Sequence, residues 1–256
     1  MGESSEPPEP PAPPPPPAPP PASAPPPGPV APPPPPGTAP GVNPLRELLF
    51  ADLEPAEVRA VFTKGGAATA YLLELADAAE RLDAAAARAA LAKAPAWDTE
   101  ARLHLQAWTL ARQAGVDPGE HAKDVLGVVV DMGLDDGLDT LAGFADGSAR
   151  YLNHAGSGIV WEVPDVAIGQ LVRALLDEAA IVVSMGAALD GPRLAAPPRG
   201  NTMLSVLTRG GIYVGVGPIA AISADPRGGP VIAAATELVR VLVQRADQAQ
   251  AANEPR

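Results

Sequence analysis

The sequence predicts an α+β fold in which an N-terminal helical region precedes an antiparallel sheet of about six strands covered by two apolar helices. Prolines crowd the N-terminus, where 22 of the 34 occur within the first 40 positions, so a disordered proline-rich tail is expected before the folded part. From about residue 45 to 116 apolar residues recur with helical spacing, and after that the spacing changes to the alternation typical of strands. Two later segments are apolar around most of a helical circumference, as expected for helices that cover a sheet.

The tail, residues 1–44, is expected to act as a tether. It contains two runs of five prolines, at 13–17 and 32–36, which favour an extended polyproline II conformation without a core. Proline-binding domains of the SH3 type favour a basic residue beside the prolines, and no Lys or Arg occurs before Arg46. We therefore interpret the tail as a spacer.

A helical subdomain, residues 45–116, is predicted to form a helical hairpin after a short first helix. A proline in the first turn predicts that this helix covers 55–62 and stops at the glycine pair 65–66. The alanine-rich stretch 67–94 predicts one long helix. Asp98 is expected to cap a further helix that ends near Ala114.

The α+β domain is expected to span residues 117–247, with a disordered tail at 248–256. Two Asp-Gly pairs, at 136–137 and 146–147, indicate tight turns between strands. The strands are expected at 125–131, 138–145, 148–154, 159–163, 202–207 and 212–216. The two covering helices are expected at 165–188 and at 230–245.

Charge and composition exclude several classes of function. The formal net charge is −12, and an acidic surface repels phosphate backbones and anionic lipids, so neither nucleic-acid binding nor membrane binding is expected. The longest uncharged stretch after the tail, 210–224, is too short and too glycine-rich for a bilayer span. No secretory signal is evident, so we expect a cytoplasmic protein. The chain has no cysteine, which excludes disulfides, a thiol nucleophile and thiolate metal sites. The excess of arginine over lysine is typical of GC-rich, bacterial-like coding sequences.

Two local patterns resemble ligand sites but are better explained by structure. Gly215, Gly217 and Ala220 match a dinucleotide-binding glycine pattern, yet a proline follows the second glycine and no second parallel strand is expected. A local acidic cluster does not fit the register of a calcium loop, so we interpret it as solvated turns and expect no metal site. Its members are Asp131, Asp135, Asp136 and Asp139.

The segment 146–162 carries the densest set of chemically capable side chains. Strand alternation predicts that Arg150 and His154 share one face while Tyr151 and Asn153 share the other. A hydrolytic site would use His154 as base, Ser157 as nucleophile and Glu162 to orient the imidazole, but no nucleophile elbow surrounds the serine. The candidates for contact with a ligand or partner are Arg150, Tyr151, Asn153, His154 and Arg209.

These observations favour a non-enzymatic protein, an adaptor or scaffold that binds a protein partner or a second copy of itself. The expected contact surface is the α+β domain or the helical hairpin, and no cofactor is expected. The alternative is a small-molecule-binding protein or hydrolase that uses the segment from Arg150 to Glu162 together with the turn at Arg209. That alternative requires these two regions to converge on one pocket.

Overall fold

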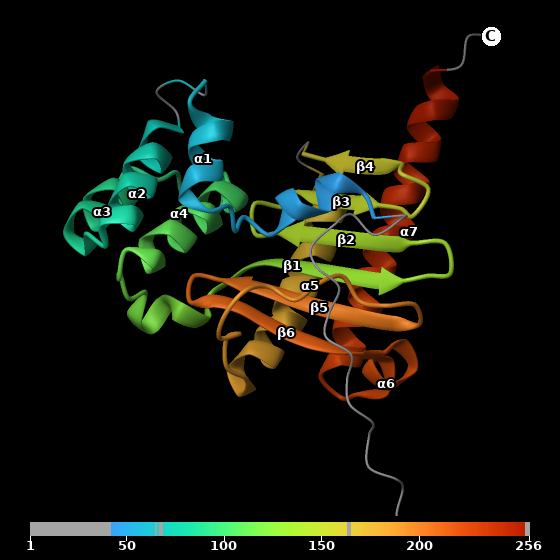
Figure 1. Ribbon diagram of the computed structural model, residues 1–256. Helices are drawn as coiled ribbons and strands as arrows, with labels where there is room; N and C mark the ends of the chain where they lie inside the picture. The colour runs from blue at the N-terminus through green and yellow to red at the C-terminus, as the bar shows by residue number, and fades with distance from the viewer. Residues whose placement is uncertain (1–41, 65, 67–68, 163–164, 254–256) are drawn as a thin grey trace, which may run out of the picture. The chain divides into compact units, whose positions relative to one another are not determined.

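A six-stranded antiparallel sheet forms the centre of the protein, with strand order β4-β3-β2-β1-β5-β6 (Figure 1). The computed structural model describes residues 42–253, apart from 65, 67–68 and 163–164, and these residues belong to one compact unit. The α+β class, the six antiparallel strands and the two covering helices are confirmed. Residues 1–41 of the predicted disordered tail lie outside the described residues; of its last three, Asn43 caps η1 (Pro44–Leu49) and Pro44 is the first residue of this helical turn.

The strands agree closely with those expected. They are β1 (Val125–Gly133), β2 (Leu138–Phe144), β3 (Ala149–Leu152), β4 (Gly158–Trp161), β5 (Asn201–Thr208) and β6 (Gly211–Pro218). Gly137 and Gly147 have φ angles of 146° and 82°, which explains why the two Asp-Gly pairs form the turns. β3 ends at Leu152, two residues earlier than expected, and β4 is only four residues long.

The helical region precedes the sheet in the chain, and its α-helices lie at one end of the sheet (Figure 1). It contains η1 (Pro44–Leu49), α1 (Pro55–Phe62), α2 (Ala70–Arg81), α3 (Ala84–Leu91), α4 (Ala101–Gln113) and η3 (Gly119–Lys123). The prediction of one long helix over 67–94 is wrong, because the chain turns between α2 and α3. Leu82 adopts a left-handed conformation with φ 53°, and the Asp83 side chain accepts a hydrogen bond from the amide of Ala86 at 3.0 Å. Asp83 therefore caps a new helix where alanine content alone favoured continuation.

The helix expected to be capped by Asp98 begins instead at Ala101, with Glu100 at the N-cap position. Its first amide donates to a carboxylate oxygen of Asp146 at 3.0 Å, so the cap comes from the β2–β3 turn. This contact joins the helical region to the sheet. It could not be found from the local sequence, because the two residues are 45 positions apart.

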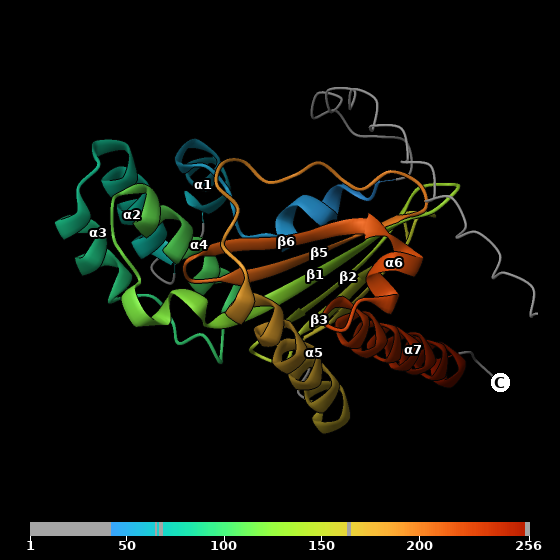
Figure 2. The ribbon, with the colours of Figure 1, turned by 90° about the horizontal axis from the view of Figure 1, so that it is seen from below.

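Two long helices, α5 (Val166–Met185) and α7 (Gly228–Asn253), cover one face of the sheet, and the short α6 (Ile219–Ala224) follows β6. Figure 2 shows α5 and α7 on one side of the strands and η1 on the other. The expected end of the last helix near residue 245 is wrong, since residues 248–253, predicted to be disordered, continue the helix. These residues are mostly alanine and glutamine, which are good helix formers. Residues 254–256 lie outside the described part.

Separate apolar cores lie on the two faces of the sheet. On the α5/α7 face, Val128, Val130 and Leu141 pack with buried residues of both helices. On the opposite face, Leu49 and Phe50 pack with Phe144 of β2 and with Leu105 of α4. The second core fixes η1 and α4 to the sheet. Among the described helices, none is long and apolar enough to cross a membrane.

Candidate functional site

Arg150, a candidate ligand contact, is engaged within the protein. It points to the face covered by η1 and α4, where its guanidinium lies 5.7 Å from the centre of the Phe144 ring. It forms an ion pair with Glu162, which also accepts from Arg102 at 3.5 Å. Burial is the main cause of the lowered pKa of Arg150. Glu162 is therefore committed to two arginines and does not orient His154.

His154 and Tyr151 instead meet at Asp139 of β2. The imidazole Nδ1 lies 2.8 Å from one carboxylate oxygen, and the Tyr151 hydroxyl donates to the other at 2.6 Å. The prediction that His154 shares a face with Arg150 is thus wrong. β3 ends at Leu152, so strand alternation no longer holds at position 154, and the turn carries the imidazole to the Tyr151 side.

The remaining candidates of this segment form a turn. Asn153 accepts a hydrogen bond from the backbone amide of Ser157 at 2.9 Å, which shapes the β3–β4 connection. No hydrogen bond among the described residues joins Ser157 to His154. The three residues weighed for hydrolysis therefore lie in separate contacts: His154 with Asp139, Ser157 with Asn153, and Glu162 with Arg150.

Arg209 lies in the β5–β6 turn, at the other end of the sheet. Its guanidinium pairs with Asp124 at 2.7 Å, and its carbonyl accepts from Arg112 at 2.6 Å. The β5–β6 turn lies beside the start of β1, because Thr208 pairs with Val125. His154 lies at the opposite end of the sheet, next to Asp139 at the start of β2. The two regions that the small-molecule alternative needs to bring together do not converge.

Three members of the acidic cluster, Asp131, Asp135 and Asp139, take part in separate ion pairs. Asp139 binds His154, and Asp135 pairs with Arg199 at 2.5 Å on the surface. Within residues 42–253 as described, no group of three potential metal ligands was found. His154 also lines an open hollow of 570 Å³ at the end of the sheet, together with Asp135, Asp136 and Arg199.

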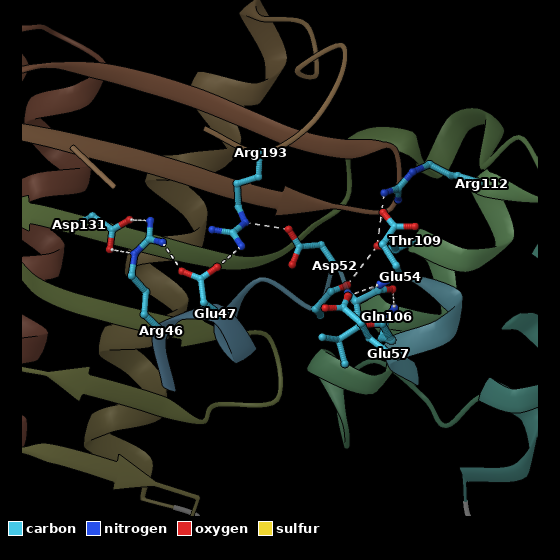
Figure 3. Close-up of polar contacts among 12 residues, drawn as sticks. Arg46, Glu47, Asp52, Glu54, Glu57, Gln106, Thr109, Arg112, Asp131 and Arg193 are labelled. Atoms are coloured by element: carbon cyan, nitrogen blue, oxygen red, sulfur yellow. Dashed lines mark hydrogen bonds and ion pairs between the residues drawn. The ribbon is translucent and has the colours of Figure 1, made fainter. Parts of the chain in front are cut away.

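The strongest polar cluster was missed by the sequence reasoning, and it lies where η1 meets the sheet (Figure 3). Arg46 binds Asp131 of β1 through two hydrogen bonds, of 2.9 and 2.6 Å, and the exposed fractions of these side chains are 2% and 0%. The Thr140 hydroxyl donates to the same carboxylate at 2.6 Å. The bonds and charge of Asp131 raise the pKa of Arg46 although burial alone would lower it.

A second arginine extends this cluster to the loop before β5. Arg193 donates to Asp52 at 2.7 Å and to Glu47, which also pairs with Arg46 (Figure 3). Both guanidinium groups lie over the Phe50 ring, at 4.9 Å for Arg46 and 3.9 Å for Arg193. Every charge in this cluster has a partner, so the arrangement fastens segments together and offers no reactive group.

The Asp139 cluster makes a testable contribution to stability. Burial alone would raise the pKa of Asp139, but the bonds from Tyr151 and His154 outweigh it and hold that pKa below its usual range. Ionised Asp139 therefore stabilises the folded state at pH values above the ordinary pKa of an aspartate, and this stabilisation is lost as the pH falls through the lowered pKa of Asp139.

We expect Tyr151→Phe to raise the pKa of Asp139 and to cost about 1 kcal/mol of stability at neutral pH, because one charge-assisted bond at a partly exposed site is removed. Carboxyl NMR titration and urea unfolding over a pH series would measure both effects. Tyr213→Phe is the matched control, since no hydrogen bond of the Tyr213 hydroxyl occurs in the described region. An unchanged pKa of Asp139 in Tyr151→Phe would contradict the assignment.

The most prominent unpartnered feature is the outer edge of β6. Leu189 donates its amide to the carbonyl of Ile212 at 2.7 Å, which covers the start of this edge. In an edge strand every second residue directs its N–H and C=O groups away from the neighbouring strand. The Ile212 carbonyl points away from β5, so the N–H and C=O groups of Val214 and Val216 point the same way. In the described part of the chain no hydrogen bond reaches these groups, and 53% of Val216 is exposed.

Comparisons with known proteins provide no relative for this chain: no family model, curated protein or solved structure matches it.

Proposed function

We propose that this chain is a non-enzymatic cytoplasmic adaptor or scaffold protein that binds an extended protein segment at the free edge of β6. The observation that carries the proposal is an edge strand whose central part, beyond the stretch that Leu189 covers, lacks the usual protection. Proteins normally block exposed strand edges with charges, prolines, bulges or short strands. β6 has no charged residue from Gly211 to Pro218, its single proline is its last residue, and its register with β5 is continuous.

The opposite edge of the same sheet provides an internal comparison. β4 has only four residues, and its end is flanked by Glu162, which carries the ion pairs with Arg150 and Arg102. That edge is short and charged, as expected for an edge that remains solvated. The difference between the two edges supports a role for β6 in main-chain pairing with another segment.

The side-chain geometry supports binding better than hydrolysis. His154, Ser157 and Glu162 each have a different partner within the protein, and no nucleophile lies beside the imidazole in the described contacts. A hydrolytic site needs a base within hydrogen-bond reach of its nucleophile. The capable side chains of 146–162 are better explained as supports for the β2–β3–β4 meander.

Site-specific photocrosslinking in the native cell tests this proposal. With a photoreactive amino acid at position 216 we expect covalent protein adducts, whereas the same amino acid at position 82 should give none above background. Leu82 is a suitable control because it is 75% exposed but lies in the α2–α3 turn, far from any strand edge. Adducts must also decrease when Val214 is changed to Lys in the same chain. Equal labelling at both positions would contradict the proposal.

A further inference from the structure

We propose that the occupant of the β6 edge is β6 of a second copy of this chain, so that two sheets join in an antiparallel, two-fold symmetric dimer. This inference rests on the proposed function of the edge and names its partner. The pairing would extend each six-stranded sheet across the dimer axis without a gap.

The charge distribution favours a second copy over other extended partners. The chain has a net charge of −12, so most faces would bring carboxylates together if two copies met. β6 and α6 lie within 210–224, the longest uncharged stretch after the tail. In a two-fold interface the same surface meets itself, and a surface without charge avoids repulsion at the axis.

The backbone geometry defines a register for this pairing. Placing the axis at Val216 sets the two copies of Val216 opposite each other and Val214 opposite the partner subunit's Pro218, so the stretch at Ile212 that Leu189 covers stays outside the pairing. The two Val216 residues would exchange a pair of backbone hydrogen bonds, and each Val214 amide would donate to the partner subunit's Pro218 carbonyl, which gives about four bonds in all. Gly215 has no side chain to obstruct the approach of the two strands, and within its own chain a Cβ at this position would have no neighbour within 4 Å.

The protected β4 edge limits the assembly to two chains. If both edges were open, strand pairing could continue from one molecule to the next and form a fibre. Because only β6 is long and uncharged, pairing there uses the single available edge and closes the assembly.

The decisive experiment measures the mass of the full chain by light scattering and its dissociation constant by sedimentation equilibrium. We expect a species of twice the 25.9 kDa chain mass, with a dissociation constant that decreases as salt screens the net negative charge. Val216→Lys should weaken the dimer at least tenfold. Val160→Lys is the matched control, because Val160 is 54% exposed on β4, and this variant should remain dimeric.

A second variant separates the interface from the fold. The amide of Val216 points outward, so Val216→Pro removes a donor to the partner while leaving the β5–β6 ladder intact. We expect it to be monomeric with a melting temperature close to that of the parent. A dimer that persists in both Val216 variants, or a parent chain that stays monomeric at all concentrations, would overturn the inference.

The crosslinking result at position 216 distinguishes this inference from the proposed function. Adducts of the chain with itself support both the proposed function of the edge and the self-pairing. Adducts with a different protein alone, combined with a monomeric parent chain, would overturn the self-pairing and leave the edge as a docking site. The absence of any adduct would contradict both the self-pairing and the docking role of the edge.

Discussion

Replacing Arg46 by Met is expected to lower the free energy of unfolding by about 3–5 kcal/mol, which is the usual cost of leaving a buried charge without its partner. Asp131 is fully buried, and without Arg46 it would keep only the Thr140 hydroxyl as a side-chain donor. The cost should exceed that of Asp131→Asn, since Arg46 would still pair with Glu47 and the amide oxygen could still accept a bond. Urea unfolding at neutral pH measures both variants.

The double variant Arg46→Met with Asp131→Leu provides the control. Removing both charges also removes the unpaired carboxylate, and apolar replacements of buried ion pairs are often neutral or stabilising. We therefore expect it to recover most of the stability lost in Arg46→Met. A loss below about 1 kcal/mol in the single variant would show that the pair is more hydrated than its burial indicates.

The regular elements could be predicted because their signals are local. β-branched runs separated by Asp-Gly pairs give the strands and their turns, and the narrow polar stripe of α5 predicts a helix that covers a sheet. The break at Leu82 was missed because alanine-rich sequence favours a continuous helix. Asp83, which can cap a helix, was the available signal.

The polar clusters could not be predicted, because their members are far apart in the sequence. Arg46 and Asp131 are separated by 85 positions, and Tyr151 and His154 meet a carboxylate on a neighbouring strand. One local clue existed: Asp131 follows the buried run 128–130, and a charged residue in such a strand needs a partner. That clue indicates a buried ion pair but does not identify the arginine.

The edge position of β6 also depends on the whole sheet. Sequence order places β6 after β5, but whether another strand lies beyond it is decided by the sheet order. In the sequence alone, the uncharged stretch 210–224 argues only against a membrane span. Once the strand is known to lie at an edge, the same absence of charge becomes evidence for strand pairing.

Phe144→Ala is the second change with a large expected effect, also about 3–5 kcal/mol, because it opens a cavity where η1 and α4 pack on the sheet. The ring is fully buried, and the guanidinium groups of Arg102 and Arg150 lie 5.9 and 5.7 Å from its centre. Its cross-strand neighbour is Gly127, which has no side chain to fill the space. The surroundings therefore have little means to collapse into the cavity.

Gly127→Ala tests this reasoning by the opposite change. A Cβ at Gly127 would lie 2.8 Å from the Phe144 ring, so this variant alone should cost about 1–3 kcal/mol through overpacking. Combined with Phe144→Ala, the added methyl group would occupy part of the cavity, and the double variant should lose less stability than the sum of the single losses. Strictly additive losses would contradict direct packing. The core containing Phe144 also joins η1 and α4 to the sheet, so far-UV circular dichroism and tryptophan fluorescence should report one shared unfolding transition in each variant.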